Sequence, residues 1–230
     1  MHPTTTRPPV ARRRLRHRLA TTSIFAASLL AGLATQHPGA TADAAPPLVG
    51  ESSSPAVAGA ATQARTTLGM AQRTGNPALV RRYVRERTVI ATMVANELGI
   101  DPVALDEAWI RADQAHEIAV LSALSQLGTP YRYLGAEPDV AFDCSGLTKW
   151  AWEQAGVELT HQSGVQIDAA APRDRSTAQA GDLVQYPGHV MMYLGAGDAI
   201  VHAPNSGSVV NINVISESKA SSVRFGNPIG

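Results

Sequence analysis

Cysteine is almost absent from this chain, because Cys144 is the only one among 230 residues. A single thiol cannot form an intramolecular disulfide, so the fold depends on its hydrophobic core and hydrogen bonds. The thiol is therefore incidental, used for pairing with another chain, or chemically reactive. We interpret it as reactive because of the residues that surround it.

Metal-binding patterns are also lacking. The chain has seven histidines, but it contains no His-Glu-x-x-His motif and no paired cysteines. We therefore predict neither a metal nor another cofactor. Beyond residue 44 the chain also has no concentrated basic stripe, so we predict no binding to nucleic acid.

The balance of 19 basic and 19 acidic residues conceals an uneven distribution. Six arginines precede an uncharged stretch at residues 19–34, and Ala42-Asp43-Ala44 follows. This order predicts a secretory signal peptide at residues 1–44, and hence a protein that is secreted or held in the cell wall or periplasm. The stretch is too short for a confident membrane span, so we expect no stable membrane insertion after cleavage. An uncleaved anchor is the alternative.

The next part of the chain changes composition twice. Residues 45–76 are rich in Ala, Ser and Pro and predict a disordered linker. Residues 77–116 form a helical N-terminal segment in which one apolar-periodic run ends at Gly99 and another begins at Asp101-Pro102. We expect a helical hairpin or one broken helix, which either packs against the remainder or covers its cleft.

The lone cysteine begins a third helical pattern. Asp143 precedes Cys144, and Leu147, Trp150 and Ala151 follow at helical spacing. Unpaired backbone N–H groups and the helix dipole favour a thiolate at such a position. Asp143 or Ser145 is expected to cap the same turn.

Two histidines follow on segments with the pattern of β-strands. His189 begins a stretch that ends at Gly195, and His202 ends the return stretch from Ala199. Adjacent antiparallel strands would bring the two rings side by side, as a base and its orienting group require.

The order of these motifs resembles the NlpC-type cell-wall peptidases, which are relatives of papain. The resemblance covers residues 117–230 and implies an α+β, papain-like catalytic domain. In such a domain, the helix that bears the nucleophile packs on an antiparallel sheet, here preceded by the helical hairpin. The motifs are Gly128-Thr129-Pro130-Tyr131, Asp143-Cys144-Ser145-Gly146, Gly181-Asp182-Leu183-Val184, Gly188-His189-Val190, Tyr193-Leu194-Gly195 and Val201-His202-Ala203-Pro204.

The resemblance implies a role for each site residue. Cys144 would be the nucleophile, His189 its base and His202 the group that orients the base. Tyr131 would orient the thiol or, with the backbone N–H of Cys144, stabilise an oxyanion; packing on the helix is the alternative for Tyr131. The candidates for the substrate cleft are Asp143, Ser145, His161 and Gln162.

Two departures from the family pattern stand near these residues. Thr160-His161 replaces the usual Pro and Arg, which we expect to affect substrate preference. The stretch between the two histidines is one residue longer than usual, and either bulges or displaces His202.

These features together predict a secreted cysteine endopeptidase. By resemblance, its substrates are the stem peptides of bacterial peptidoglycan, cut between D-glutamate and the diamino acid. No wall-binding repeat is evident in the sequence, so the sequence leaves open whether another protein recruits this one to the cell wall. The alternatives are a non-hydrolytic peptidoglycan-binding protein and a thiol acyltransferase on the same fold.

Overall fold

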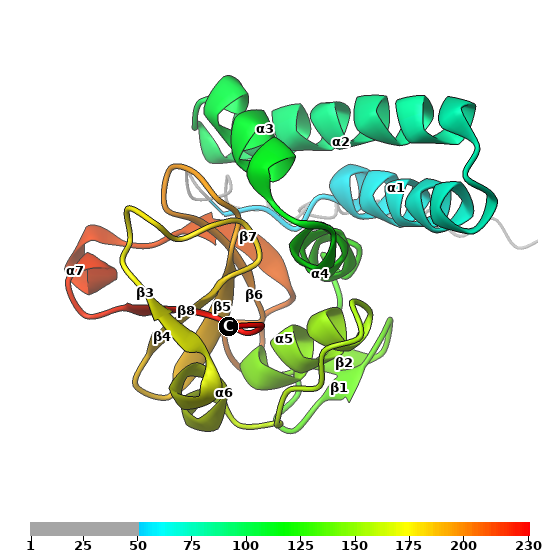
Figure 1. Ribbon diagram of the computed structural model, residues 1–230. Helices are drawn as coiled ribbons and strands as arrows, with labels where there is room; N and C mark the ends of the chain where they lie inside the picture. The colour runs from blue at the N-terminus through cyan, green and yellow to red at the C-terminus, as the bar shows by residue number, and fades with distance from the viewer. Residues whose placement is uncertain (1–50) are drawn as a thin grey trace, which may run out of the picture. The chain divides into compact units, whose positions relative to one another are not determined.

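Seven helices and eight strands make up the computed structural model, which describes residues 51–230 (Figure 1). The predicted signal peptide and the first six residues of the predicted linker lie outside the described residues. Four helices come first: α1 (Pro55–Thr74), α2 (Pro77–Leu98), α3 (Pro102–Arg111) and α4 (Gln114–Leu124). None of the helices within residues 51–230 has both the length and the apolar character needed to cross a bilayer.

The prediction of a disordered linker at residues 45–76 is wrong from Pro55 onward, because this stretch forms α1. Ser54 caps the helix and accepts a hydrogen bond from Val57 N–H, and Gly75 ends it with φ of 61°. Alanine is the strongest helix former. The small side chains of Ala61 and Ala64 are fully buried in the core, so this composition serves helix packing here.

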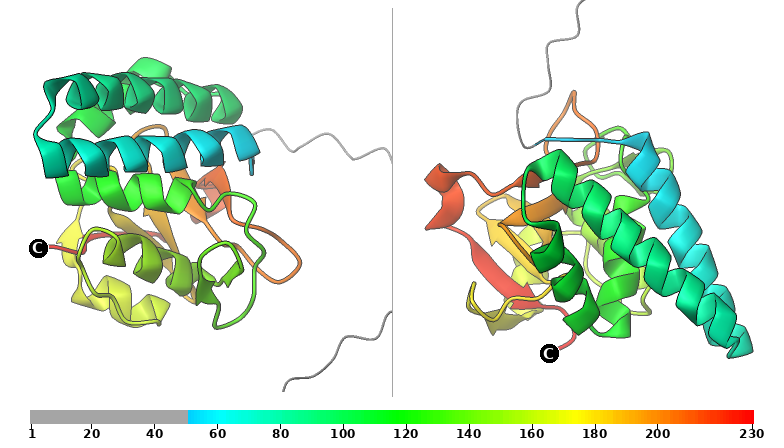
Figure 2. Two further views of the ribbon diagram at one scale, coloured as in Figure 1. Left: turned by 90° about the vertical axis from the view of Figure 1, so that its right-hand side faces the viewer. Right: turned by 90° about the horizontal axis from the view of Figure 1, so that it is seen from above.

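Helices α1 and α2 form a hairpin that the sequence does not predict, since the expected hairpin joined the runs on either side of Gly99; Figure 2 shows α1 and α2 side by side in opposite directions. The second predicted run is two helices rather than one. The break falls at Asp113, which accepts hydrogen bonds from Ala115 N–H and His116 N–H and so begins α4. A capping aspartate within an apolar-periodic pattern is the signal for this break.

The remaining elements build the sheet and its covering helices. They are β1 (Ala136–Glu137), β2 (Ala141–Phe142), α5 (Cys144–Glu153), α6 (Ser163–Ala169), β3 (Ala171–Arg173), β4 (Leu183–Tyr186), β5 (His189–Tyr193), β6 (Ala199–His202), β7 (Asn211–Val214), α7 (Glu217–Ala220) and β8 (Arg224–Asn227). Six strands form an antiparallel sheet in the order β3-β8-β4-β5-β6-β7. Helix α5 packs against β5 and β6, which confirms the predicted α+β fold with the cysteine-bearing helix on an antiparallel sheet.

One hydrophobic core joins the N-terminal helices to the sheet. It runs from Ala61 in α1 through Leu124 in α4 and Leu147 in α5 to Val201 in β6. Trp109 in α3 donates a buried hydrogen bond of 2.7 Å from Nε1 to the carbonyl of Leu194, at the end of β5.

The glycines of the turn between β5 and β6 also face the helices. A Cβ on Gly195 would lie 2.8 Å from the Ala108 Cβ, and one on Gly197 would lie 2.8 Å from Ile100 Cγ2. The N-terminal helices therefore hold the hairpin that carries the histidines, which favours the packing role that we expected for them.

Candidate active site

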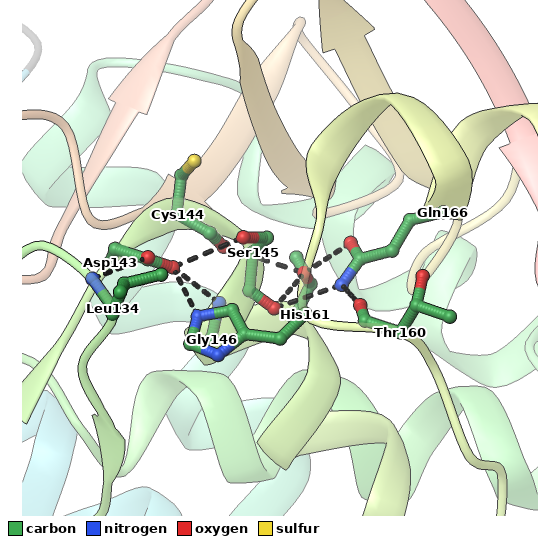
Figure 3. Close-up of polar contacts among 9 residues, drawn as sticks. Leu134, Asp143, Cys144, Ser145, Gly146, Thr160, His161 and Gln166 are labelled. Carbon is green, nitrogen blue, oxygen red and sulfur yellow. Dashed lines mark hydrogen bonds and ion pairs between the residues drawn. The ribbon is translucent and has the colours of Figure 1, made fainter.

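Asp143 is the hub of the turn that presents Cys144 (Figure 3). Its Oδ1 accepts hydrogen bonds from Gly146 N–H at 2.7 Å and from the Ser145 hydroxyl at 3.1 Å. Its Oδ2 accepts from Leu134 N–H at 2.9 Å. Asp143 therefore caps α5, as the sequence predicts, and also ties the first turn of this helix to the loop at Leu134.

His161 completes this network, with its Nε2 2.8 Å from Asp143 Oδ1. The ring is about one-quarter exposed, whereas Asp143 and Ser145 are buried. Gln162, the fourth candidate for the cleft, accepts a hydrogen bond from Val165 N–H and caps α6. Asp143, Ser145 and Gln162 thus use their polar atoms within the local structure. Their contact with substrate, and that of His161, stays a prediction.

The chain passes very close to itself beside the cysteine. A Cβ on Gly146 would lie 1.9 Å from the carbonyl oxygen of Gly135, so only glycine fits there. That carbonyl also accepts a hydrogen bond from Asp143 N–H at 2.9 Å. The approach of the β1 segment to the first turn of α5 is what requires the glycine of the Asp-Cys-Ser-Gly motif.

Burial raises the pKa of the Cys144 thiol, and the negative charge of Asp143 raises it further. The backbone N–H groups of Val190, Ser145 and Cys144 act in the opposite direction but do not outweigh burial. The expectation of a stabilised thiolate is therefore wrong for the unliganded protein, in which the thiol is protonated. The sulfur is half-buried rather than sealed, and it lies beside Val190, the neighbour of His189.

The two histidines meet as the strand pattern predicts. His189 Nε2 lies 2.9 Å from His202 Nδ1, and the ring planes are inclined at 71°. Burial lowers the pKa of His189 to about 4. Burial, and then the proximity of His189, lowers the pKa of His202 to about 3. Both rings are therefore neutral at pH 7. The 2.9 Å contact also shows that the extra residue in the β5–β6 turn does not displace His202 from His189.

Two tyrosines lie in the electrostatic field of the sulfur. A negative charge on Cys144 raises the pKa of Tyr131 and that of Tyr186, in both cases after the larger effect of burial. The Tyr186 ring also contacts the His189 ring in a tilted arrangement, with a centroid separation of 5.1 Å and an interplanar angle of 38°. The sequence indicates Tyr131 but not Tyr186, because no feature of its strand distinguishes Tyr186 from a core residue.

Gln166 was also missed, although it ties the loop of His161 to α5. Its side-chain N–H groups donate to Ser145 O at 2.9 Å and to Thr160 O at 2.7 Å, and its Oε1 accepts from the Thr148 hydroxyl at 2.7 Å. Within residues 51–230, this site included, no group of three or more His, Cys, Asp or Glu side chains could hold a metal ion.

The site therefore brings together a thiol at the start of a helix, a neutral imidazole pair and two tyrosines. Residues 128–226, which contain all of them, match the sequence model of the NlpC/P60 family. These residues form an NlpC/P60 domain. The four helices that precede it are outside the matched region.

Curated relatives of the NlpC/P60 domain carry endopeptidase names. The chain is 39% identical over 110 residues to a probable endopeptidase of Corynebacterium glutamicum, covering 46% of this chain and 51% of the relative. It is 31% identical to the murein DD-endopeptidase MepH of Escherichia coli, over 46% of this chain and 43% of that protein. It is 36% identical to the bifunctional muramidase/DL-endopeptidase CwlT of Bacillus subtilis, over 36% of this chain and 27% of that protein. The chain spans about a quarter to a half of the length of these curated relatives.

Proposed function

We propose that this protein is an exported cysteine endopeptidase that hydrolyses the stem peptides of bacterial peptidoglycan. The observation that carries the proposal is the 2.9 Å contact between His189 and His202, with His189 on the strand whose next residue, Val190, directs its backbone N–H toward the only thiol of the chain. A buried pair of neutral imidazoles next to a helix-initiating cysteine is suited to remove a proton from sulfur. The endopeptidase names of the relatives support the same class of reaction.

The reaction begins from a neutral thiol and a neutral imidazole, since the pKa of Cys144 is raised and that of His189 is lowered. As the sulfur attacks the amide carbonyl, its proton passes to His189 and a carbon–sulfur bond forms. The backbone N–H of Cys144 and the hydroxyl of Tyr131 donate hydrogen bonds to the resulting oxyanion. His189 then protonates the leaving amine, and the carbon–nitrogen bond breaks to give an acyl-enzyme.

Water completes the cycle. His189, now neutral again, accepts a proton from water as the water oxygen attacks the acyl-enzyme. The carbon–sulfur bond breaks, the carboxylic acid leaves, and the proton returns to the sulfur. His202 holds the ring of His189 in place throughout this sequence.

The bond that we propose is cleaved joins D-glutamate to the diamino acid of the stem peptide. The name of CwlT, a DL-endopeptidase, supports this choice, whereas MepH is named a DD-endopeptidase. Export would place the protein in the cell wall or periplasm or outside the cell, where such peptides occur.

Mass spectrometry of purified muropeptides incubated with the protein tests this proposal. We expect two fragments whose masses sum to the substrate plus one water, and the fragment masses identify the bond. Cys144→Ser should abolish the fragments with a nearly unchanged thermal unfolding midpoint. Joined products would indicate an acyltransferase. Intact peptides that co-purify with the wild-type protein would indicate a binding protein and would overturn the proposal of endopeptidase activity.

A further inference from the structure

Asn211 faces the imidazole pair from the neighbouring strand. It is the first residue of β7 and the direct cross-strand partner of His202 in β6. Only 1% of its surface is exposed. Its amide is therefore buried on the strand next to His202, although no motif points to it.

The orientation of this amide is fixed by a carboxylate outside the NlpC/P60 domain. Asn211 Nδ2 donates a hydrogen bond of 2.7 Å to Glu51 Oε1 and a longer one of 3.4 Å to Val209 O. A carboxylate and a carbonyl only accept hydrogen bonds, so the amide nitrogen must face them. The amide oxygen, Oδ1, consequently points the other way.

Glu51 is itself held in register with β7. Ser52 N–H donates to Ile212 O at 2.9 Å, and Ile212 N–H donates to Ser52 O at 2.7 Å. The Ser52 hydroxyl also donates to Glu97 in α2. The segment before α1 thus adds one bridge to the edge of the sheet and places Glu51 beside Asn211.

Two buried polar atoms on the His202–Asn211 pair, His202 Nε2 and Asn211 Oδ1, have no hydrogen-bond partner within residues 51–230. An N–H on the ring and an amide oxygen are complementary, and leaving both unpaired would be costly. The Asn211 amide also acts to raise the pKa of His202, against the larger effect of burial. These atoms belong together, with His202 as donor.

A proton on His202 Nε2 then determines which nitrogens of both rings are protonated. If His202 carries its proton on Nε2, its Nδ1 is a lone pair and accepts from the N–H at His189 Nε2, 2.9 Å away. His189 Nδ1 is then unprotonated and free to accept the thiol proton. In the opposite tautomer, His202 would donate from Nδ1, and His189 Nδ1 would already carry a proton.

We infer that Asn211, oriented by Glu51, is a positioning residue that sets the tautomer of His202 and thereby keeps His189 in the form that can act as a base. The inference rests on the proposed function of His189 as the base. It assigns a role in the active site to a residue that precedes the NlpC/P60 domain by more than 70 positions.

Variants of the full chain test the inference. Asn211→Leu removes the acceptor at similar volume and should lower kcat on a stem peptide by about tenfold or more with little change in KM. Glu51→Leu leaves the amide free to turn and should give a smaller loss. Glu51→Gln retains an acceptor and should behave as wild type. Asn213→Ala is the matched control, because Asn213 is on the same strand and accepts only from Val214 N–H.

The tautomers are read directly from the imidazole 15N chemical shifts, and the rate of Cys144 alkylation by iodoacetamide reports on the base without any peptide. Wild-type protein should show protonated Nε2 on both rings, and Asn211→Leu should show a changed pattern and slower alkylation at pH 7. If Asn211→Leu fails to fold, Glu51→Leu carries the same measurement. Unchanged 15N shifts and alkylation in both leucine variants would overturn the inference. If wild-type protein cleaves no peptide but the shifts and alkylation respond as expected, only the proposed function fails.

Discussion

His189 Nε2 and His202 Nδ1 lie 2.9 Å apart, within hydrogen-bond distance of each other. Burial lowers the pKa of both rings, to about 4 and about 3, so neither is charged near neutral pH. A neutral pair of this kind can take up one proton from the thiol and return it. Because the structure contains a protonated thiol and a neutral base, attack and proton transfer must be coupled.

Replacing each histidine separately tests the assignment of roles. We expect His189→Ala to lower kcat/KM by about 10²- to 10⁴-fold, the usual contribution of a general base. His202→Ala should lower it less, because His189 retains its ring and loses only its orienting partner. The measurement is steady-state release of peptide fragments, with a thermal unfolding curve for each variant. Wild-type rates in both folded variants would remove the imidazole pair from the mechanism.

The acid limb of the pH profile reports the lowered pKa of His189. A free imidazole would lose its basic form below about pH 6.5, whereas His189 should keep it down to about pH 4. We therefore expect kcat/KM to stay high through pH 5 and to fall near pH 4. Measurements from pH 3.5 to 8 check this expectation. A fall centred near pH 6.5 would mean that the active base is solvated, contrary to the structure.

The lowered pKa values of His189 and His202 also predict how the stability of the protein changes with pH. Between about pH 6.5 and 4, the unfolded chain binds protons at both rings while the folded protein does not. The two rings should therefore make the free energy of unfolding fall as the pH is lowered through this range. Denaturant unfolding at each pH separates loss of structure from protonation of the base.

The chemistry-bearing residues were predictable because local patterns specify them. The Asp-Cys-Ser-Gly turn is a helix start, and His189 and His202 lie on short apolar runs on either side of a glycine-containing turn, so their placement on strands follows from short-range rules. Gly99 ends α2 with φ of 68°, as its position after the apolar run indicates. In each case the decisive interaction lies within a few residues of the motif.

The features that the sequence did not predict depend on contacts between distant parts of the chain. The composition of α1 predicts a linker because its buried face consists mostly of alanine, and only the packing of a partner helix against that face shows that it belongs to the core. The pKa of Cys144 depends on burial by the sheet as well as on its helix, so the helix start alone gave the wrong direction. Glu51 and Asn211 are separated by 160 positions, and only the strand register brings them together.

The close approach at Gly146 gives a prediction about the nucleophile turn. Gly146→Ala would place a Cβ 1.9 Å from Gly135 O, which the two backbones must move apart to relieve. We expect the free energy of unfolding to fall by about 3 kcal/mol or more, together with loss of activity. Denaturant unfolding and peptide cleavage measure the two effects.

Gly59→Ala is the matched control for that substitution. Gly59 is exposed within α1, and a Cβ there meets nothing within 4 Å. Alanine should stabilise the helix by about 0.5 to 1 kcal/mol and leave activity unchanged. Equal effects of the two substitutions would show that the turn around Gly146 is not constrained as the structure indicates.

His116 links α4 to the sheet through two carboxylates. The ring is fully buried, with Nδ1 2.8 Å from Asp113 Oδ2 and Nε2 3.4 Å from Asp182 Oδ1. Burial alone would lower the pKa of His116, but the hydrogen bonds and charges of Asp182 and Asp113 outweigh burial and raise it. His116 therefore acts in stability rather than in the reaction.

A raised pKa in the folded state fixes the sign of the pH dependence. The stabilisation from charged His116 should be complete below pH 6.5 and should disappear as the pH rises through the folded-state pKa. We expect His116→Gln to lower the free energy of unfolding by about 3 kcal/mol at pH 6, and by less at pH 9. Taking the difference from wild type at each pH cancels the contribution of His189 and His202.

Arg82→Gln is the control. This substitution breaks an exposed pair with Glu86 and should lower the free energy of unfolding by about 0.5 kcal/mol or less at both pH values. A His116→Gln difference that grows with pH would mean that the ring is neutral in the folded protein, and the two carboxylates would then have to be stabilised by other groups.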